Sequence, residues 1–163
     1  MKRTIFFVLF MVLTIVSALQ VSGQKADFNG SWKLNIAKST MVEYANLVRI
    51  DVQIKGDSLL TERYYDTGDG QEYPFTENLT LDGKEYNITI YDMPRKAKAS
   101  FSDVDGSVIV ESTITFNGNG GSEDFVSKET WKADIANKTL TISFKNSIAG
   151  EESTGLFFFS KPE

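Results

Sequence analysis

The residue types available for chemistry in this chain are few, because its 163 residues include neither histidine nor cysteine. Histidine is the commonest general base and a common metal ligand, and the cysteine thiolate is a strong nucleophile. Carboxylates, lysines and hydroxyl groups remain, but their spacing singles out no pair of carboxylates for glycoside hydrolysis. We therefore expect no catalytic residue, no metal site and no cofactor, and interpret the protein as a non-enzyme.

One acidic segment has the composition of a calcium-binding loop. Asp66, Asp69 and Glu72 lie close together with Gly68 and Gly70. Their spacing lacks the ordered series of ligands and the closing glutamate that such a loop requires. We interpret the segment as a solvated loop between two strands.

Three charged residues, Arg63, Glu77 and Glu129, fall on the otherwise apolar faces of predicted strands. An unpaired buried charge costs several kcal/mol, so a solidly packed interior rarely contains one. Either these residues pair with one another, or they face water and a ligand. The alternative places them near strand ends, at the rim, where a charge costs little.

The elements that must position these residues are strands, because alternation with a period of two dominates the sequence after residue 45. Turn signals such as Asp82-Gly83 and Asp105-Gly106 separate the runs, and the first of them predicts a hairpin between residues 75–81 and 85–91. The pattern predicts an all-β, antiparallel up-and-down barrel of about eight to ten strands. The predicted strands lie around Trp32 and at residues 48–55, 59–65, 75–81, 85–91, 97–102, 108–116, 125–135, 139–145 and 155–161.

Residues 35–47 do not alternate in this way. Ser39 and Thr40 have the side chains of helix N-caps, and apolar residues follow them. We expect at most a short helical cap over one end of the barrel.

The segment from Phe28 to Leu34, with Gly30 and Trp32, resembles the opening strand of the calycins, the lipocalin and fatty-acid-binding-protein superfamily. A group of exported bacterial lipocalin-like proteins, common in Bacteroidetes-type genomes, is similar over most of the chain. The resemblance implies a calycin-like barrel, small-molecule binding and a structural role for Gly30 and Trp32, with Trp32 closing the barrel floor. The segments that carry the closer similarity are residues 27–39, 53–60, 81–84, 129–132 and 138–141.

Two features depart from the fatty-acid-binding pattern. The connection after the first strand is too short for a lid of two helices. Nothing near the C-terminus matches the arginine and tyrosine arrangement that holds a fatty-acid carboxylate. Because Glu77 and Glu129 would accompany Arg63 in the interior, a simple fatty acid is disfavoured as a ligand unless Arg63 is free of these carboxylate neighbours.

The first residues have the features of a secretory signal peptide. Lys2 and Arg3 precede an uncharged, mostly apolar run at residues 5–16, which is too short to span a bilayer. Small residues follow, and cleavage after Gly23 would leave Gln24 as the new N-terminus. Cleavage elsewhere, or a retained signal anchor, is the alternative.

Signal removal at residue 23, rather than after residue 18 or 20, leaves residues 24–163 as one lipocalin-like barrel domain. This domain keeps 15 of the 17 basic residues and all 22 acidic residues, a net charge of −7. Such a surface repels nucleic acids and anionic membranes. The absence of cysteine excludes a lipid-anchored N-terminus, so we expect an exported protein, periplasmic or extracellular, with no integral membrane segment.

These observations favour a protein that holds a small apolar or amphipathic molecule inside the barrel. Aromatic walls would bind the apolar body, and one cation with two carboxylates would orient a polar head. The alternative is a structural or protein-interaction module of the cell envelope, whose barrel is filled by its own aromatic residues. The candidate ligand-binding residues are Arg63, Tyr65, Phe75, Glu77, Tyr86, Phe101, Phe116, Glu129 and Trp131.

Overall fold

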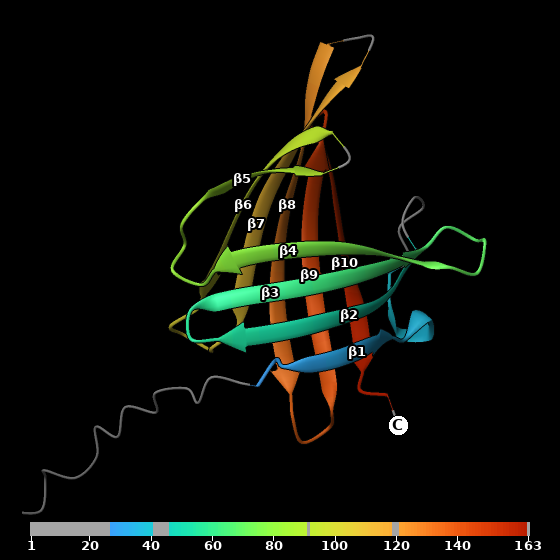
Figure 1. The fold of residues 1–163 in the computed structure, drawn as a ribbon, viewed down its shortest axis with the longest axis vertical. Coiled ribbons are helices and arrows are strands. Elements are labelled where there is room, and N and C mark those ends of the chain that lie inside the picture. Colours follow the sequence, from blue (N-terminus) through green and yellow to red (C-terminus); the bar gives the residue numbers. More distant parts are fainter. Residues whose placement is uncertain (1–26, 41–45, 91, 119–120, 163) are drawn as a thin grey trace, which may run out of the picture.

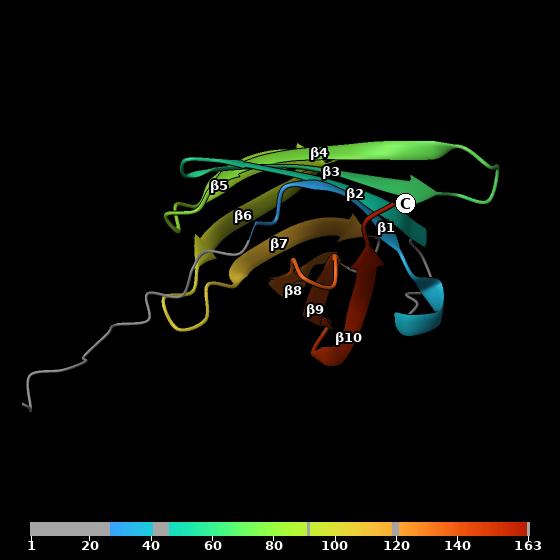
Figure 2. The ribbon, with the colours of Figure 1, turned by 90° about the horizontal axis from the view of Figure 1, so that it is seen from below.

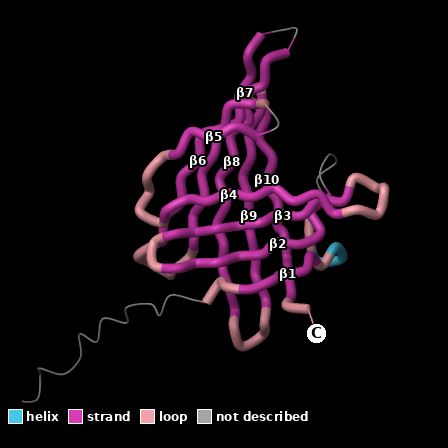
Figure 3. The backbone as a smooth tube through the Cα atoms, viewed as in Figure 1, coloured by secondary structure: helices cyan, strands magenta, loops and turns pink. Residues whose placement is uncertain are grey.

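A single antiparallel sheet of ten strands contains most of the described residues, as the computed structural model shows (Figure 3). The structure describes residues 27–40, 46–90, 92–118 and 121–162. The prediction of an all-β, up-and-down architecture is confirmed. The strands are β1 (Gly30–Leu34), β2 (Asn46–Lys55), β3 (Ser58–Asp66), β4 (Glu72–Thr80), β5 (Tyr86–Ile90), β6 (Met93–Phe101), β7 (Val108–Gly118), β8 (Gly121–Asp134), β9 (Thr139–Ile148) and β10 (Glu151–Ser160).

The sheet curls into a nearly closed barrel. Its strand order is β4-β3-β2-β1-β10-β9-β8-β7-β6-β5, so β1 pairs with β10 and joins the two ends of the chain. Strands β4 and β5 form the two edges, and beyond the end of β4 a backbone bridge joins Asp82 to Ser100 on β6, the strand next to β5. Such closure protects most of the backbone hydrogen-bonding groups of a sheet.

Two layers face each other across the interior. Strands β1 to β4 run across the front of the molecule in Figure 1, and β7 to β10 run behind them in the crossing direction. Figure 2 shows the same two layers from below, with the β1 to β4 layer above the other. Side chains on the inner faces of both layers therefore meet in the space between them.

The Asp82-Gly83 turn does not form the predicted hairpin, and that prediction is wrong. Strand β4 pairs with β3, and β5 pairs with β6, so the turn carries the chain from one edge of the sheet to the other. The Leu81 amide donates to the Asp57 carbonyl at 2.7 Å, and the Gly83 amide donates to the Ala99 carbonyl at 2.9 Å. Contacts with residues far away in the sequence, rather than the local turn signal, therefore determine the path of the chain after β4.

A single 3-10 turn at Ile36–Lys38 follows β1. The rest of the predicted cap, at residues 41–45, lies outside the described residues, as does the predicted signal at residues 1–23. No helix in the described part of the chain has the length and apolar character needed to cross a bilayer.

One end of the barrel is closed by large apolar side chains, and we call it the sealed end. Trp32 is completely buried there, and its indole N–H donates to the Phe28 carbonyl at 2.8 Å. The Lys161 ammonium lies 4.9 Å from the centre of the Trp32 ring and covers it from outside. Trp131, Leu140, Ile142 and Phe159 are also fully or almost fully buried in this core.

Along the inner face of β6 to β10, exposed side chains appear only in the two rows of residues farthest from the sealed end. Because side chains alternate between the two faces of a strand, the register places the inner residues in four rows across these strands. The first row is Phe101, Val108, Trp131, Ile142 and Phe157; the second is Ala99, Val110, Glu129, Phe144 and Gly155; the third is Ala97, Ser112, Ser127, Asn146 and Ser153; the fourth is Arg95, Ile114, Phe125, Ile148 and Glu151.

Candidate functional site

A buried ion pair crosses the interior between the two layers. Arg63 on β3 donates from both terminal nitrogens to the Glu129 carboxylate on β8, with N–O distances of 2.9 and 2.6 Å. The Trp131 indole N–H donates to the same carboxylate at 2.8 Å. The Arg63 guanidinium also lies 5.5 Å from the centre of the Trp131 ring. The three predicted residues therefore form one hydrogen-bonded group.

The electrostatics of this group favour the charged forms of both Arg63 and Glu129. Burial alone would raise the pKa of Glu129, but the Arg63 charge and the hydrogen bonds from Arg63 and Trp131 outweigh burial, so the pKa of Glu129 is lowered. Burial alone would likewise lower the pKa of Arg63, but the attraction of Glu129 raises it. Burial raises the pKa of the neighbouring Tyr65 phenol, against the opposing effect of Arg63.

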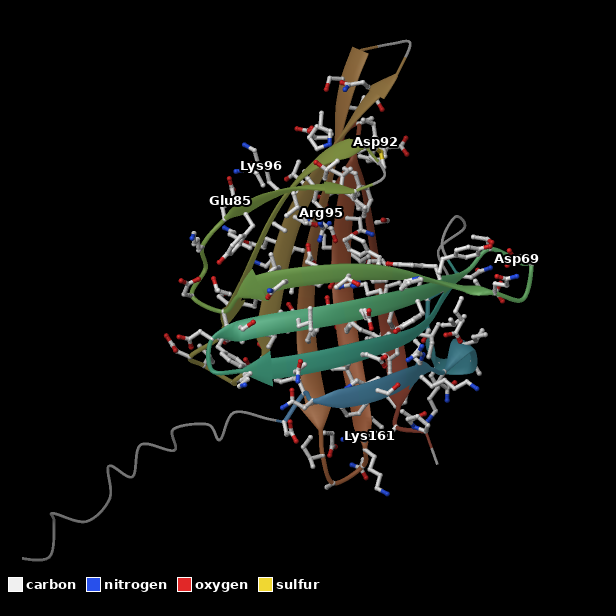
Figure 4. The ribbon with its side chains drawn as sticks, viewed as in Figure 1. Asp69, Glu85, Asp92, Arg95, Lys96 and Lys161 are labelled. Atoms are coloured by element: carbon white, nitrogen blue, oxygen red, sulfur yellow. The ribbon has the colours of Figure 1, made fainter. Side chains whose placement is uncertain are left out.

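A second buried ion pair connects the edge strand β4 to β6, the strand next to the other edge of the sheet. Arg95 on β6 donates to the Glu77 carboxylate on β4 at 2.8 and 3.0 Å, and a further bond of 3.2 Å reaches the other carboxylate oxygen. Its remaining terminal nitrogen donates to the Ser112 hydroxyl at 2.8 Å. In Figure 4 Arg95 lies between β5 above and β4 below. This pair therefore spans the junction where the edge strands β4 and β5 do not pair, which we call the seam.

Arg63, Glu77, Arg95 and Glu129 together form what we call the interior quartet. Their side chains expose between 3% and 12% of their surface, so the alternative that the predicted charges lie at a solvated rim is wrong. Each arginine has a carboxylate partner, and the quartet carries no net charge. Such pairing is what makes four buried charges tolerable.

Above the quartet, inward-facing apolar side chains remain partly exposed. Ile88, Ile114 and Phe125 flank Arg95 through the register of β5 to β8, and Phe75 lies with its ring centre 5.9 Å from the Arg95 guanidinium. All four are only half-buried. We call these four residues the mouth, because they line the end of the barrel opposite the sealed end.

The other predicted aromatic residues lie apart from the quartet. Phe101 packs at the sealed end, with its ring centre 6.4 Å from that of Phe28. Tyr86 reaches the seam, where its hydroxyl lies 3.0 Å from that of Thr80. Phe116 lies beyond the fourth row, toward the tip of the β7–β8 hairpin. The structure therefore does not gather all nine candidates into one site.

Sequence reasoning missed Arg95, the partner of Glu77. The predicted strand began at residue 97, whereas β6 begins at Met93 and its alternation continues through Arg95, Ala97 and Ala99. Extending the alternation backward by one period would have placed Arg95 on the inner face. The mouth residues Ile88, Ile114 and Phe125 were also overlooked, although each shares a face with buried residues of its own sheet.

The acidic segment between β3 and β4 lies outside the barrel, at the β3–β4 hairpin where Figure 4 labels Asp69. Asp66 accepts a hydrogen bond from the Gly68 amide at 2.7 Å, and Asp69 accepts one from the Tyr73 hydroxyl at 2.6 Å. Glu72 pairs with Arg49 on β2 at 3.2 Å. These carboxylates shape the hairpin through contacts within the chain.

Two open hollows, of about 340 and 370 Å³, lie along β5 to β8. Both are lined by Lys96 and Thr113, whose side chains alternate with inner-face residues and so face outward. The lining of the first hollow includes Ile88 and Arg95, but that of neither includes Arg63, Glu129 or Trp131. These hollows therefore belong to the outer face next to the mouth.

Comparison of the chain with protein-family models, with curated proteins and with solved structures found no match. The ten-stranded, nearly closed barrel is compatible with a calycin-like fold. The assignment of a function therefore depends on the geometry of the quartet and the mouth.

Proposed function

We propose that this protein binds a small apolar or amphipathic molecule at the mouth of its barrel. The apolar body would lie against Phe75, Ile88, Ile114 and Phe125, and a polar end would point toward the interior quartet. The observation that carries the proposal is that these inward-facing side chains are only half-buried, although they lie directly above a buried polar layer. Concave, mostly apolar sites with a few polar groups are typical of small-molecule binding.

The expected affinity follows from the area that a ligand would cover. Burial of apolar surface contributes about 0.8 kcal/mol per methylene group, so a body of about eight to ten carbons contributes about 6–8 kcal/mol. After part of this gain is lost to ordering the ligand, about 4–6 kcal/mol remains, which corresponds to a Kd from tens of micromolar to about a millimolar.

The test is a titration with N-phenyl-1-naphthylamine, an uncharged apolar probe whose fluorescence rises on transfer from water. We expect Ile114→Asn to weaken binding about tenfold or more, because a polar amide would replace part of the apolar wall. The matched control is Thr113→Asn, on the outer face of the same strand and in the lining of both outer hollows. A loss with Thr113→Asn alone would place the probe in an outer hollow and contradict the proposal.

A second candidate function is a protein-interaction module with a filled barrel. It is favoured by the complete burial of Trp32, Trp131 and Phe159 at the sealed end and by the pairing of all four quartet charges within the chain. For this candidate, the probe titration would give no saturable binding. Native mass spectrometry of protein purified from its own host would show no bound small molecule.

Export is part of the proposal. The features of residues 1–23 support secretion, and N-terminal peptide mapping of the protein recovered from its host tests it. We expect the mature chain to begin at Gln24. Recovery of peptides that precede Val21 from the mature protein would contradict this cleavage.

A further inference from the structure

The polar layer below the mouth has no charge left for an ionic ligand. Both terminal nitrogens of Arg63 are bound to Glu129, and Arg95 is shared between Glu77 and Ser112. An added carboxylate or ammonium group would therefore bring an uncompensated charge into a buried neutral layer, or would have to break an existing pair. Either outcome is unfavourable.

Two neutral hydrogen-bonding atoms in the same layer lack partners. Of the described residues, only three have a buried side-chain nitrogen or oxygen without a hydrogen bond, and two of these atoms face the interior, namely Thr61 Oγ1 and Asn146 Oδ1. Thr61 exposes 3% of its surface. The third atom, on Asp51, belongs to an outer-face carboxylate that already pairs with Arg49.

The register connects both atoms to the quartet. Thr61 lies directly opposite Glu77 in the β3–β4 pair, and both Glu77 oxygens are already occupied by Arg95. Asn146 lies opposite Ser127, which lies opposite Ser112, the hydroxyl partner of Arg95. The third row, which contains Asn146, otherwise consists of small residues, and it lies next to the fourth row, which contains the mouth residues Ile114 and Phe125.

We infer that the ligand is an uncharged molecule with an apolar body and a hydroxyl or amide N–H group, which donates to Thr61 Oγ1 or Asn146 Oδ1. This inference rests on the proposed binding at the mouth and specifies the class of ligand. A donor satisfies either atom, because Asn146 Oδ1 can only accept a hydrogen bond and the Thr61 hydroxyl can accept one as well as donate one. Sites that hold unpaired polar atoms discriminate strongly in favour of ligands that satisfy them.

The experiment compares three competitors with the same ten-carbon body, namely 1-decanol, decanoate and decylammonium, for displacement of N-phenyl-1-naphthylamine at about pH 8, where decanoate is ionised and decylammonium keeps its charge. We expect 1-decanol to compete at least about tenfold better than either ion. Thr61→Val, which removes the hydroxyl at nearly constant volume, should weaken 1-decanol binding by about two- to tenfold, after correction for any change in the affinity of the probe, which is titrated directly on the same variant. The control Thr89→Val makes the same change at an exposed position on β5 and should alter neither the affinity for 1-decanol nor that for the probe.

Each outcome decides one of the two claims. If the probe binds but decanoate or decylammonium competes as well as 1-decanol, the ligand class is wrong and binding at the mouth stands. If the probe does not bind, both claims are wrong. The competition on the unmodified protein needs no variant, and circular dichroism establishes that Thr61→Val is folded. An unchanged 1-decanol affinity in folded Thr61→Val together with Asn146→Leu would also overturn the inference.

Discussion

Arg63 and Glu129 meet across the barrel interior as a two-pronged ion pair between β3 and β8, with N–O distances of 2.9 and 2.6 Å. Sixty-six positions separate them in the sequence. Their contact joins the front layer of the barrel to the back layer at a level where the surrounding rows are no longer purely apolar. Removing one partner would leave the other charge buried and alone, which is the costly case.

The first prediction concerns the stability of Arg63→Met. We expect the free energy of unfolding to fall by about 3–5 kcal/mol at neutral pH, because Glu129 would keep only the Trp131 hydrogen bond. Urea denaturation followed by circular dichroism measures the change. The double variant Arg63→Met with Glu129→Gln should recover part of the loss, since it removes the unpaired charge. A double variant less stable than Arg63→Met would contradict this account.

The same variant should reverse the pH dependence that Glu129 contributes. In the wild type the pKa of Glu129 is lowered from 4.5, so its stabilising contribution is complete above about pH 4.5 and disappears as the pH falls through the lowered pKa. Without Arg63, burial would raise this pKa instead. Arg63→Met should therefore lose less stability at about pH 5 than at about pH 7. An equal loss at both pH values would show that Glu129 is solvated in the variant.

The third prediction separates a buried arginine from an exposed one. Arg95→Met should cost about 3–5 kcal/mol and speed hydrogen exchange in β5, because Arg95 connects the seam to β4. Arg49→Met is the control, since Arg49 also pairs with two carboxylates but is more exposed on the outer face. An exposed pair contributes about 1 kcal/mol or less. Equal effects of the two variants would contradict the role of Arg95 at the seam.

The sequence predicted those parts of the fold that depend on local alternation and local turns. The predicted strands at residues 48–55 and 59–65 pair around Gly56 as β2 and β3, and β8 keeps the predicted inner face of Glu129. The path at Asp82-Gly83 could not be predicted in this way, because it depends on where the curled sheet brings its two edges together. A tight turn has the same local signal whether or not its flanking strands pair.

The candidate site was predicted in composition but not in arrangement. Placing Arg63 and Glu129 on inner faces needed only the period of two, and the structure pairs them. The partner of Glu77 is Arg95 on β6, next to the opposite edge of the sheet, and its position follows from closure of the barrel. Contacts between residues far apart in the sequence are set by the whole sheet, so local pattern could not reveal that the quartet is neutral.

The fourth prediction tests the structural role of Trp32. Trp32→Ala should lower the free energy of unfolding by about 3–5 kcal/mol, as for other completely buried large aromatic residues. Trp32→Phe should cost about 1–3 kcal/mol, because it keeps most of the packing but leaves the Phe28 carbonyl without its donor. Tyr73, an aromatic residue that is 42% exposed, provides the control, and Tyr73→Ala should change stability by about 1 kcal/mol or less. If Trp32→Ala unfolds at the same urea concentration as the wild type, Trp32 does not stabilise the core and this prediction is wrong.

The last prediction concerns Gly155, which lies directly opposite Phe144 in the β9–β10 pair. A Cβ atom at this position would come within 2.9 Å of both Phe144 Cε1 and the Thr40 Cβ, which is closer than real Cβ atoms approach other carbons. The Phe144 ring thus occupies the space that the missing side chain leaves, and it packs against the tilted ring of Phe157, with 4.8 Å between the ring centres. The glycine is therefore required by packing.

Gly155→Ala should lower the free energy of unfolding by about 1–3 kcal/mol, because the ring must move out of a well-packed position. Phe144→Leu, which shortens the side chain that meets the new methyl group, should relieve part of this cost when the two changes are combined. The double-mutant cycle should therefore give a favourable coupling of about 0.5 kcal/mol or more. Additive losses in the cycle would show that the methyl group clashes with Thr40 alone and that Phe144 is free to move.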